Sequence, residues 1–136
     1  MSEQVVVLDA CAVIAAQQRE PGGERLLSLL AQPETRAEIH ALNVCEVYYD
    51  LLRRSPQAKL ELLLDELAYW GVSIEQDIGF PLLRRAGEIK AFWRRVSLAD
   101  CIALALAEQR GGELMTTDHQ EFDPLAAAAY PIRFLR

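Results

Sequence analysis

The sequence predicts an α/β fold in which helices cover both faces of a central parallel sheet of about five strands. Short apolar runs rich in β-branched residues alternate with longer segments of helical periodicity along the chain. That alternation is typical of strands joined by crossover helices. The 136 residues, 51% of them hydrophobic, suffice for one continuous core, so we expect residues 1–136 to form a single domain.

The expected strands are short and buried. In chain order they are residues 5–8, 38–42, 72–74, 114–117 and 132–135. The first is the clearest, because the run VVVL has a polar residue on either side. An uninterrupted apolar run of this length indicates a strand that is covered on both faces.

The expected helices fill the intervals between the strands. They run from about residue 10 to a break at Pro21-Gly22-Gly23, over 24–31, over 43–54, from Pro56 to Gly71, from an N-cap at Asp77 to Arg95, and over 98–109. Glycine and proline set most of these boundaries. Ser97 is the expected N-cap of the last helix, which Gly111-Gly112 ends.

Composition excludes several classes of protein. The first apolar run is too short for a signal peptide or a membrane span. The three cysteines form no CxxC pair, so we expect small buried residues in a reducing cytoplasm and no membrane association. The net charge of −6 argues against a broad basic surface for nucleic acid.

Four acidic residues fall where the predicted topology would gather them. Asp9 follows the first strand, Glu46 lies near the start of the helix after the second, and Asp118 ends the fourth. Asp100 lies in the first turn of its helix. Ligands of open α/β sheets bind beyond the carboxyl ends of the strands, so these acids are the candidate site.

Each acid taken alone also fits a structural role. Glu46 and Asp100 have capping-box spacing from Asn43 and Ser97. Asp9 and Asp118 could be N-caps or turn residues. Glu46 could instead pair with Arg53, two turns along the same helix.

Asp100 weakens the purely structural interpretation. Its helix, LADCIALALA, is apolar nearly all round and is therefore expected to be buried. A buried, unpaired carboxylate costs several kcal/mol or more, and no lysine or arginine lies within a turn of Asp100. Asp100 therefore requires a cation, a proton or dense hydrogen bonding.

A hard divalent cation would remove the repulsion among clustered carboxylates. Mg²⁺ or Mn²⁺ suits an all-oxygen site, whereas zinc is disfavoured because the chain has only two histidines and no ligand spacing among its cysteines. Such a cation supports phosphodiester hydrolysis by activating water and stabilising the leaving oxygen. Neutralising four acids would also reduce the net charge to −2, which weakens the objection from composition.

Four segments in order, VVVLDACAVIA, LNVCEVYYDLL, VSLADCIALALA and LMTTDHQEFDPL, resemble a PIN domain, most closely the VapC-type toxin ribonuclease of VapBC toxin–antitoxin pairs. The resemblance covers essentially the whole chain. It implies a three-layer α/β/α fold with strand order 3-2-1-4-5. It also implies an Mg²⁺- or Mn²⁺-dependent endoribonuclease whose catalytic and metal-binding acids match Asp9, Glu46, Asp100 and Asp118.

The same resemblance implies further features. Thr116 matches a position where the family commonly has a hydroxyl that orders water at the metal. An RNA substrate, a homodimer and a cognate VapB-type antitoxin are implied as partners. Cys11 departs from the family, which often has serine, threonine or asparagine there, and this leaves the orientation of water or phosphate at the site open.

Several other residues are weaker candidates. His119, in an expected surface loop, could contact phosphate, and Asp123 could be an outer ligand or begin a turn or helix. Arg94 and Arg95, in a basic cluster with Arg84, Arg85 and Lys90, could supply phosphate contacts or be a solvated face.

Two alternatives to a nuclease stay open at the level of sequence. An aspartate-based phosphatase or receiver-like domain would also have aspartates at strand ends, but it would want an Asp at residue 11 or a lysine after a late strand. The other alternative is a PIN-fold binding or scaffold module, for which Cys11 is the only hint.

Overall fold

The architecture follows the predicted class. The computed structural model describes residues 3–136, which form a five-stranded sheet in the order β3-β2-β1-β4-β5. Every pair of neighbouring strands is parallel. The order 3-2-1-4-5 and the parallel arrangement are therefore confirmed.

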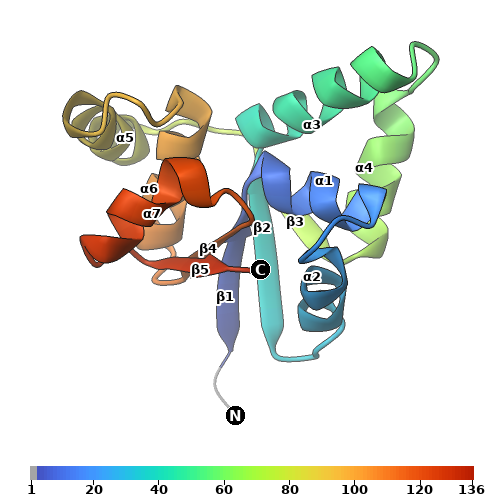
Figure 1. Ribbon diagram of the computed structural model, residues 1–136, viewed down its shortest axis with the longest axis horizontal. Coiled ribbons are helices and arrows are strands. Elements are labelled where there is room, and N and C mark those ends of the chain that lie inside the picture. The colour runs from blue at the N-terminus through green and yellow to red at the C-terminus, as the bar shows by residue number, and fades with distance from the viewer. Residues whose placement is uncertain (1–2) are drawn as a thin grey trace.

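The elements alternate along the chain as expected (Figure 1). The strands are β1 (Gln4–Leu8), β2 (Thr35–His40), β3 (Val72–Glu75), β4 (Glu113–Thr116) and β5 (Ile132–Phe134). The helices are α1 (Ala10–Gln18), α2 (Gly23–Leu30), α3 (Ala41–Arg54), α4 (Leu60–Tyr69), α5 (Phe80–Phe92), α6 (Leu98–Gln109) and α7 (His119–Ala127). Within residues 3–136, no helix is both long and apolar enough to cross a bilayer.

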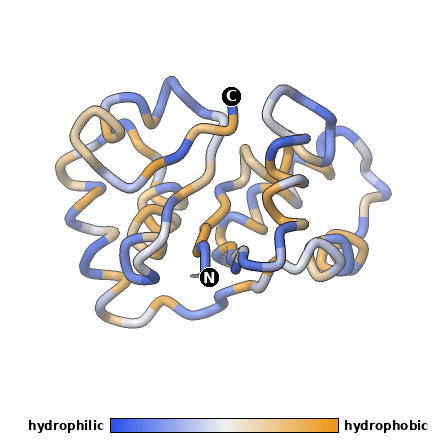
Figure 2. Tube along the Cα trace, turned by 90° about the horizontal axis from the view of Figure 1, so that it is seen from below, coloured by the Kyte–Doolittle hydropathy of each residue, from blue (hydrophilic) through white to orange (hydrophobic). Residues whose placement is uncertain are grey.

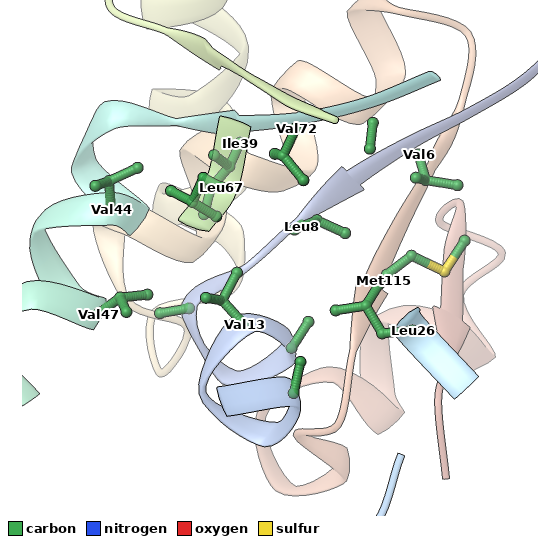
Figure 3. Close-up of a cluster of buried hydrophobic side chains, with 14 of the residues drawn as sticks. Val6, Leu8, Val13, Leu26, Ile39, Val44, Val47, Leu67, Val72 and Met115 are labelled. Atoms are coloured by element: carbon green, nitrogen blue, oxygen red, sulfur yellow. The ribbon is translucent and has the colours of Figure 1, made fainter. Parts of the chain in front are cut away.

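The sheet separates two hydrophobic cores. One lies between the sheet and α1 to α4, and its side chains from strands and helices meet in Figure 3. The other lies between the sheet and α5 to α7. Val6 and Leu8 of β1 point into the first core and Val7 into the second, because successive side chains of a strand alternate between faces. Hydrophobic segments lie inside both layers in Figure 2.

The second strand was predicted wrongly at both ends. It runs from Thr35 to His40, whereas residues 38–42 were expected. Its early residues are mostly polar, and Glu38 among them pairs with Arg110 at 2.7 Å. Its end is set by His40, whose Nδ1 accepts a hydrogen bond from the Leu42 amide and so starts α3 at Ala41.

The α5 and α7 predictions also need correction. The N-cap of α5 is Gly79 rather than Asp77, since Pro81 fits only the first turn of a helix. The helix ends at Phe92 rather than Arg95. The chain after Asp118 was not predicted as an element, yet it forms α7 even though Pro124 lies inside it. Helix α4 starts at Leu60, four residues after Pro56.

Close packing between α1 and α2 depends on Gly23. A Cβ atom built on Gly23 would lie 2.3 Å from the carbonyl oxygen of Ala15. Only glycine allows the two helix backbones to approach this closely. The predicted break at Pro21-Gly22-Gly23 therefore marks the contact that holds α2 against α1.

Candidate active site

The carboxyl ends of β1, β2 and β4 meet at one edge of the sheet, where α1, α3 and α7 begin (Figure 1). Asp9 lies between β1 and α1, and Asp118 between β4 and α7. Glu46 comes from α3 and Asp100 from the first turn of α6. The charges of all four acids raise the pKa of Cys11, and several raise the pKa of one another. The structure therefore brings these four predicted acids close together.

Asp9 is the most buried of the four acids, with no exposed surface. One carboxylate oxygen, Oδ1, caps α1 by accepting a hydrogen bond from the Ala12 amide at 2.8 Å. The other oxygen, Oδ2, is buried without a protein partner. One oxygen of Asp9 therefore serves as the N-cap that the sequence allowed, and the other has no protein partner.

Thr116 joins Asp9 to Asp118. Its Oγ1 accepts a hydrogen bond from the Asp118 amide at 3.0 Å, and its hydroxyl lowers the pKa of Asp9. Thr116 itself is fully buried. The hydroxyl is thus engaged with both acids and acts on the site by positioning them.

Replacing Thr116 with valine should weaken binding of Mn²⁺ or Mg²⁺ by roughly 10- to 100-fold, the usual cost of losing an outer partner of a metal ligand. Loss of the hydroxyl should also raise the pKa of Asp9 further, since Thr116 lowers that pKa. Calorimetric titration of the metal measures the effect. Thr117→Val, the same change at the neighbouring buried residue, is the control, and equal affinities in both variants would contradict this role.

Asp100, Asp118 and Glu121 form the tightest group. Each offers a carboxylate oxygen, and these oxygens lie within 4.8 Å of one another. Asp118 Oδ1 also caps α7 by accepting from the Glu121 amide at 3.0 Å. Ser97 caps α6 as predicted, accepting from the Asp100 amide at 3.2 Å. The two caps fix the helix starts that carry these residues, and the closeness of the oxygens suits a metal site.

Glu46 does not cap its helix as the predicted capping box would require. Because α3 begins at Ala41, Glu46 lies in the second turn, and its Oε1 is buried without a partner. Asn43 is fully buried instead, and its side-chain amide donates to the Ala99 carbonyl at 3.3 Å. That contact fixes α3 beside the start of α6 and so holds Glu46 near Asp100.

Burial and mutual repulsion raise the pKa values of three acids. For Asp9 and Asp100 the largest cause is burial, followed for Asp100 by the charge on Asp9. Burial also raises the pKa of Glu46, as does the charge on Glu121. The charge on Glu121 also raises the pKa of Asp100. The site therefore binds protons tightly when no cation is present.

These features fit a divalent cation. Buried carboxylate oxygens without partners, Oδ2 of Asp9 and Oε1 of Glu46, are the hard donors that Mg²⁺ and Mn²⁺ prefer. Asp100, Asp118 and Glu121 add further oxygens. No histidine or cysteine belongs to this group among residues 3–136, which agrees with an oxygen site rather than a zinc site.

Cys11 lies at the rim of the site. It lines an open pocket of about 320 Å³ together with Asp118 and His119. Burial and the four acids raise the pKa of its thiol, so the thiol stays protonated. The prediction that all three cysteines are buried was wrong, since only Cys101 is buried, Cys11 is intermediate and Cys45 is exposed.

His119 begins α7 rather than lying in a loop. Its Nδ1 is 2.8 Å from Asp123 Oδ1, its Nε2 is 2.8 Å from the Arg136 carbonyl oxygen, and its ring stacks on Phe134. Asp123 is thus paired with His119 and belongs to the helix. Both side chains have structural partners.

The basic cluster divides in the structure. Arg85 pairs with Glu108 at 2.7 Å, and Lys90 donates to the carbonyls of Arg94 and Val96. The side chains of Arg94 and Arg95 are exposed in the turn before Ser97. A larger cavity of about 540 Å³, lined by Arg36, Glu38 and Arg110 among others, lies away from the acids.

Sequence reasoning missed Glu121 and Asn43. The signal for Glu121 was present, because Asp118-x-x-Glu121 has capping-box spacing, but α7 was not expected. Asn43 was assigned to a cap because the start of α3 was placed two residues late. Both omissions follow from errors in helix boundaries.

Comparison with known proteins agrees with this fold. The family model described as "PIN domain" matches residues 6–127. No curated protein sequence matches significantly. Among solved structures, a toxin-antitoxin complex from Klebsiella pneumoniae is similar with a TM-score of 0.71 and 18% identity, over 96% of this chain and 98% of that chain.

Two further structures share the fold. A DNA-bound VapBC from Salmonella typhimurium has a TM-score of 0.71 and 15% identity over 100% of both chains. VapBC-1 from nontypeable Haemophilus influenzae has a TM-score of 0.64 and 17% identity, over 97% of this chain and 98% of that chain. The family match spans most of the chain, and the chain therefore belongs to the PIN domain family.

PIN domains are generally nucleases, and the phosphatase or receiver alternative fails on membership of this family. The structure adds a second reason. A receiver needs a lysine at its acids, whereas Lys90 donates to backbone carbonyls of the turn before Ser97 and Lys59 precedes α4.

Proposed function

We propose that this protein is an endoribonuclease that uses Mg²⁺ or Mn²⁺ to hydrolyse RNA phosphodiester bonds. The observation that carries the proposal is the group of buried and half-buried carboxylates near the strand ends, including the unpartnered oxygens of Asp9 and Glu46. In such a group, repulsion is relieved by a cation, and an RNA backbone needs a cation in order to approach it.

Five acids would hold the cation: Asp9, Glu46, Asp100, Asp118 and Glu121. When bound, the cation would lower the pKa of water and offset charge on the scissile phosphate. Water adds to phosphorus, the bond to the leaving oxygen breaks, and a phosphate end and a hydroxyl end result. Thr116 would position Asp9 and Asp118, while Cys11, as a neutral rim residue, adds no charge against the substrate.

The flanking basic residues are the proposed phosphate contacts. Arg94 and Arg95 are exposed just before the helix that carries Asp100. Their cations would attract the phosphate backbone toward the acids. Because His119 is paired with Asp123 and with a backbone carbonyl, we propose for it a structural role at the rim of the pocket.

The purified protein should cut RNA in the presence of Mg²⁺ or Mn²⁺, and EDTA should abolish the cleavage. Restoring the cation should restore it, because the acids alone cannot activate water. Gel analysis of a labelled structured RNA measures both effects. Cleavage that persists in EDTA would contradict the proposed mechanism, and no cleavage with either cation would favour a PIN-fold binding module.

We further propose that the protein is the cytoplasmic toxin of a VapBC-type pair, active as a homodimer and held inactive by a VapB-type antitoxin. The support is that structurally similar chains are VapBC or toxin-antitoxin complexes. The test is co-expression with the product of a small upstream reading frame. Copurification of that product and arrest of growth when it is omitted are expected, whereas growth unaffected by expression alone would contradict the toxin role.

A further inference from the structure

A row of side chains leads from the acid site along the exposed side of α3. Glu46, Tyr49 and Arg53 are spaced by three and four residues, so they lie on one face of the helix. The seven helical steps from Glu46 to Arg53 span about 10 Å. The row therefore extends away from the candidate metal site.

Tyr49 faces outward, although it is a large aromatic residue. It is 45% exposed, while its neighbour Tyr48 packs against the core between the sheet and α1 to α4. Tyr49 lies three residues from Glu46 on the same face of α3. The ring is thus held at the edge of the acid site while much of its surface stays in contact with solvent.

Arg53 stacks on Tyr49 and retains its charge for an outside partner. Its guanidinium carbon lies 5.0 Å from the centre of the Tyr49 ring. Within residues 3–136 no carboxylate lies within 4.0 Å of its side-chain nitrogens, whereas the next residue, Arg54, is paired with Asp50 at 2.6 Å. The Glu46–Arg53 ion pair considered from the sequence is therefore not formed, and the guanidinium N–H groups of Arg53 have no carboxylate partner among the described residues.

An unpaired nucleotide matches this pair of side chains. Its base has a flat face that stacks on tyrosine or on a guanidinium plane, and its phosphate accepts the forked donors of arginine. The surface is thus complementary to an anion that also carries an aromatic plane.

We propose that Tyr49 and Arg53 form a nucleotide shelf, on which the base of a single-stranded residue next to the cleaved bond stacks while Arg53 binds its phosphate. The shelf assigns two residues of α3 to substrate binding and rests on the proposed nuclease function. A paired base would have its face covered by its neighbours in the duplex. The enzyme should therefore favour loops and single strands over helices.

The test measures binding of a short unpaired RNA that carries one 2-aminopurine, whose fluorescence reports the binding. Every protein tested also carries Asp100→Asn, so that the RNA stays intact. Tyr49→Leu should weaken binding by roughly 5- to 150-fold, the range expected for loss of one stacked base. Tyr49→Phe keeps the ring and should bind like the parent. Arg53→Gln should reduce the salt dependence of binding by about 0.7 in log–log slope, one phosphate contact on a single strand.

Two other residues of the same types supply matched controls. Arg54→Gln removes an adjacent arginine that is already paired, and Tyr69→Leu removes a tyrosine that is 89% exposed on α4. Both should leave RNA binding unchanged. If Tyr49→Leu and Arg53→Gln bind like the parent, the shelf is overturned while the nuclease stands.

The Tyr49→Phe variant separates stacking from positioning. If it binds RNA as weakly as Tyr49→Leu, binding depends on the hydroxyl rather than on the ring, and the shelf is overturned. If the parent binds no RNA and the intact protein cuts none, the shelf and the proposed function fail together. That result differs from failure of the shelf alone, in which cleavage by the intact protein persists.

Discussion

Asp100→Asn is expected to reduce RNA cleavage by several orders of magnitude and, at the same time, to stabilise the metal-free protein. Asparagine keeps the size of the side chain but removes a charge that the cation needs, so both metal binding and cleavage should fall. Without metal, the same charge is unfavourable, because burial and Asp9 raise the pKa of Asp100. Relief of that cost should add roughly 1–3 kcal/mol at neutral pH, since each pKa unit corresponds to about 1.4 kcal/mol.

The opposite signs identify the role of the residue. A carboxylate that served only to cap or pack α6 would lose stability on substitution, whereas a metal ligand loses function and gains stability. Urea unfolding in EDTA and cleavage in Mn²⁺ measure the two effects. Asp65→Asn, at an exposed acid on α4, should change neither. Full cleavage by Asp100→Asn, or weaker stability in EDTA, would contradict the assignment.

Metal-free protein should lose stability as the pH rises from about 5 to about 8, and the divalent cation should restore most of that loss. The folded pKa values of Asp9, Glu46 and Asp100 are raised, above an ordinary carboxyl value of about 4. The folded state therefore holds more protons than the unfolded chain in this window, and stability falls with pH. The stabilisation from these bound protons is fully present below the carboxyl pKa values of the unfolded chain, and it is lost as the pH rises through the raised pKa values of the folded state.

The cation competes with these protons. At about 100 times its dissociation constant, it should add about 2.7 kcal/mol, and the addition should be larger at high pH, where fewer protons must be displaced. Urea unfolding across this pH range, in EDTA and in Mn²⁺, measures both terms. A metal effect that does not change with pH would contradict the assignment of the acids as ligands.

His119 contributes to the pH dependence with the same sign. The Arg136 carbonyl and Asp123 raise its pKa, so the stability it adds is present at low pH and lost as the pH rises through its folded value. A His119→Asn variant removes this contribution. The part of the pH dependence of stability that Mn²⁺ abolishes is assigned to the acids, because His119 is engaged with Asp123 and Arg136 outside the acid group.

The sequence predicted best where local and tertiary preferences agree. Helix α6 has the expected bounds because Ser97 caps it and its apolar residues fill the core on that face of the sheet. The same apolar surroundings made the burial of Asp100 predictable, and the structure leaves it 8% exposed. Asp9 and Asp118 were placed correctly at the strand ends because parallel strands deliver their carboxyl ends to one edge.

The rest depended on contacts between distant segments. The start of α3 is set by His40, which also reaches the Asp77 carbonyl at 3.0 Å, and no local signal marks a histidine as a cap. The polar residues of β2 are stable in the sheet because Arg110, 72 residues away, pairs with Glu38. The membership of Glu121 in the site requires α7 to turn it toward Asp100, which spacing alone does not reveal.

The position of Arg136 bears on how the protein can be handled. Its side chain donates to the Thr117 carbonyl, and the residue lines the same pocket as Asp118 and Cys11. Any affinity tag or fusion partner joined after it would begin at the mouth of the site and compete with RNA for space. Strand β1 begins at the opposite edge of the sheet (Figure 1), so an extension placed ahead of it leaves the approach to the acids clear.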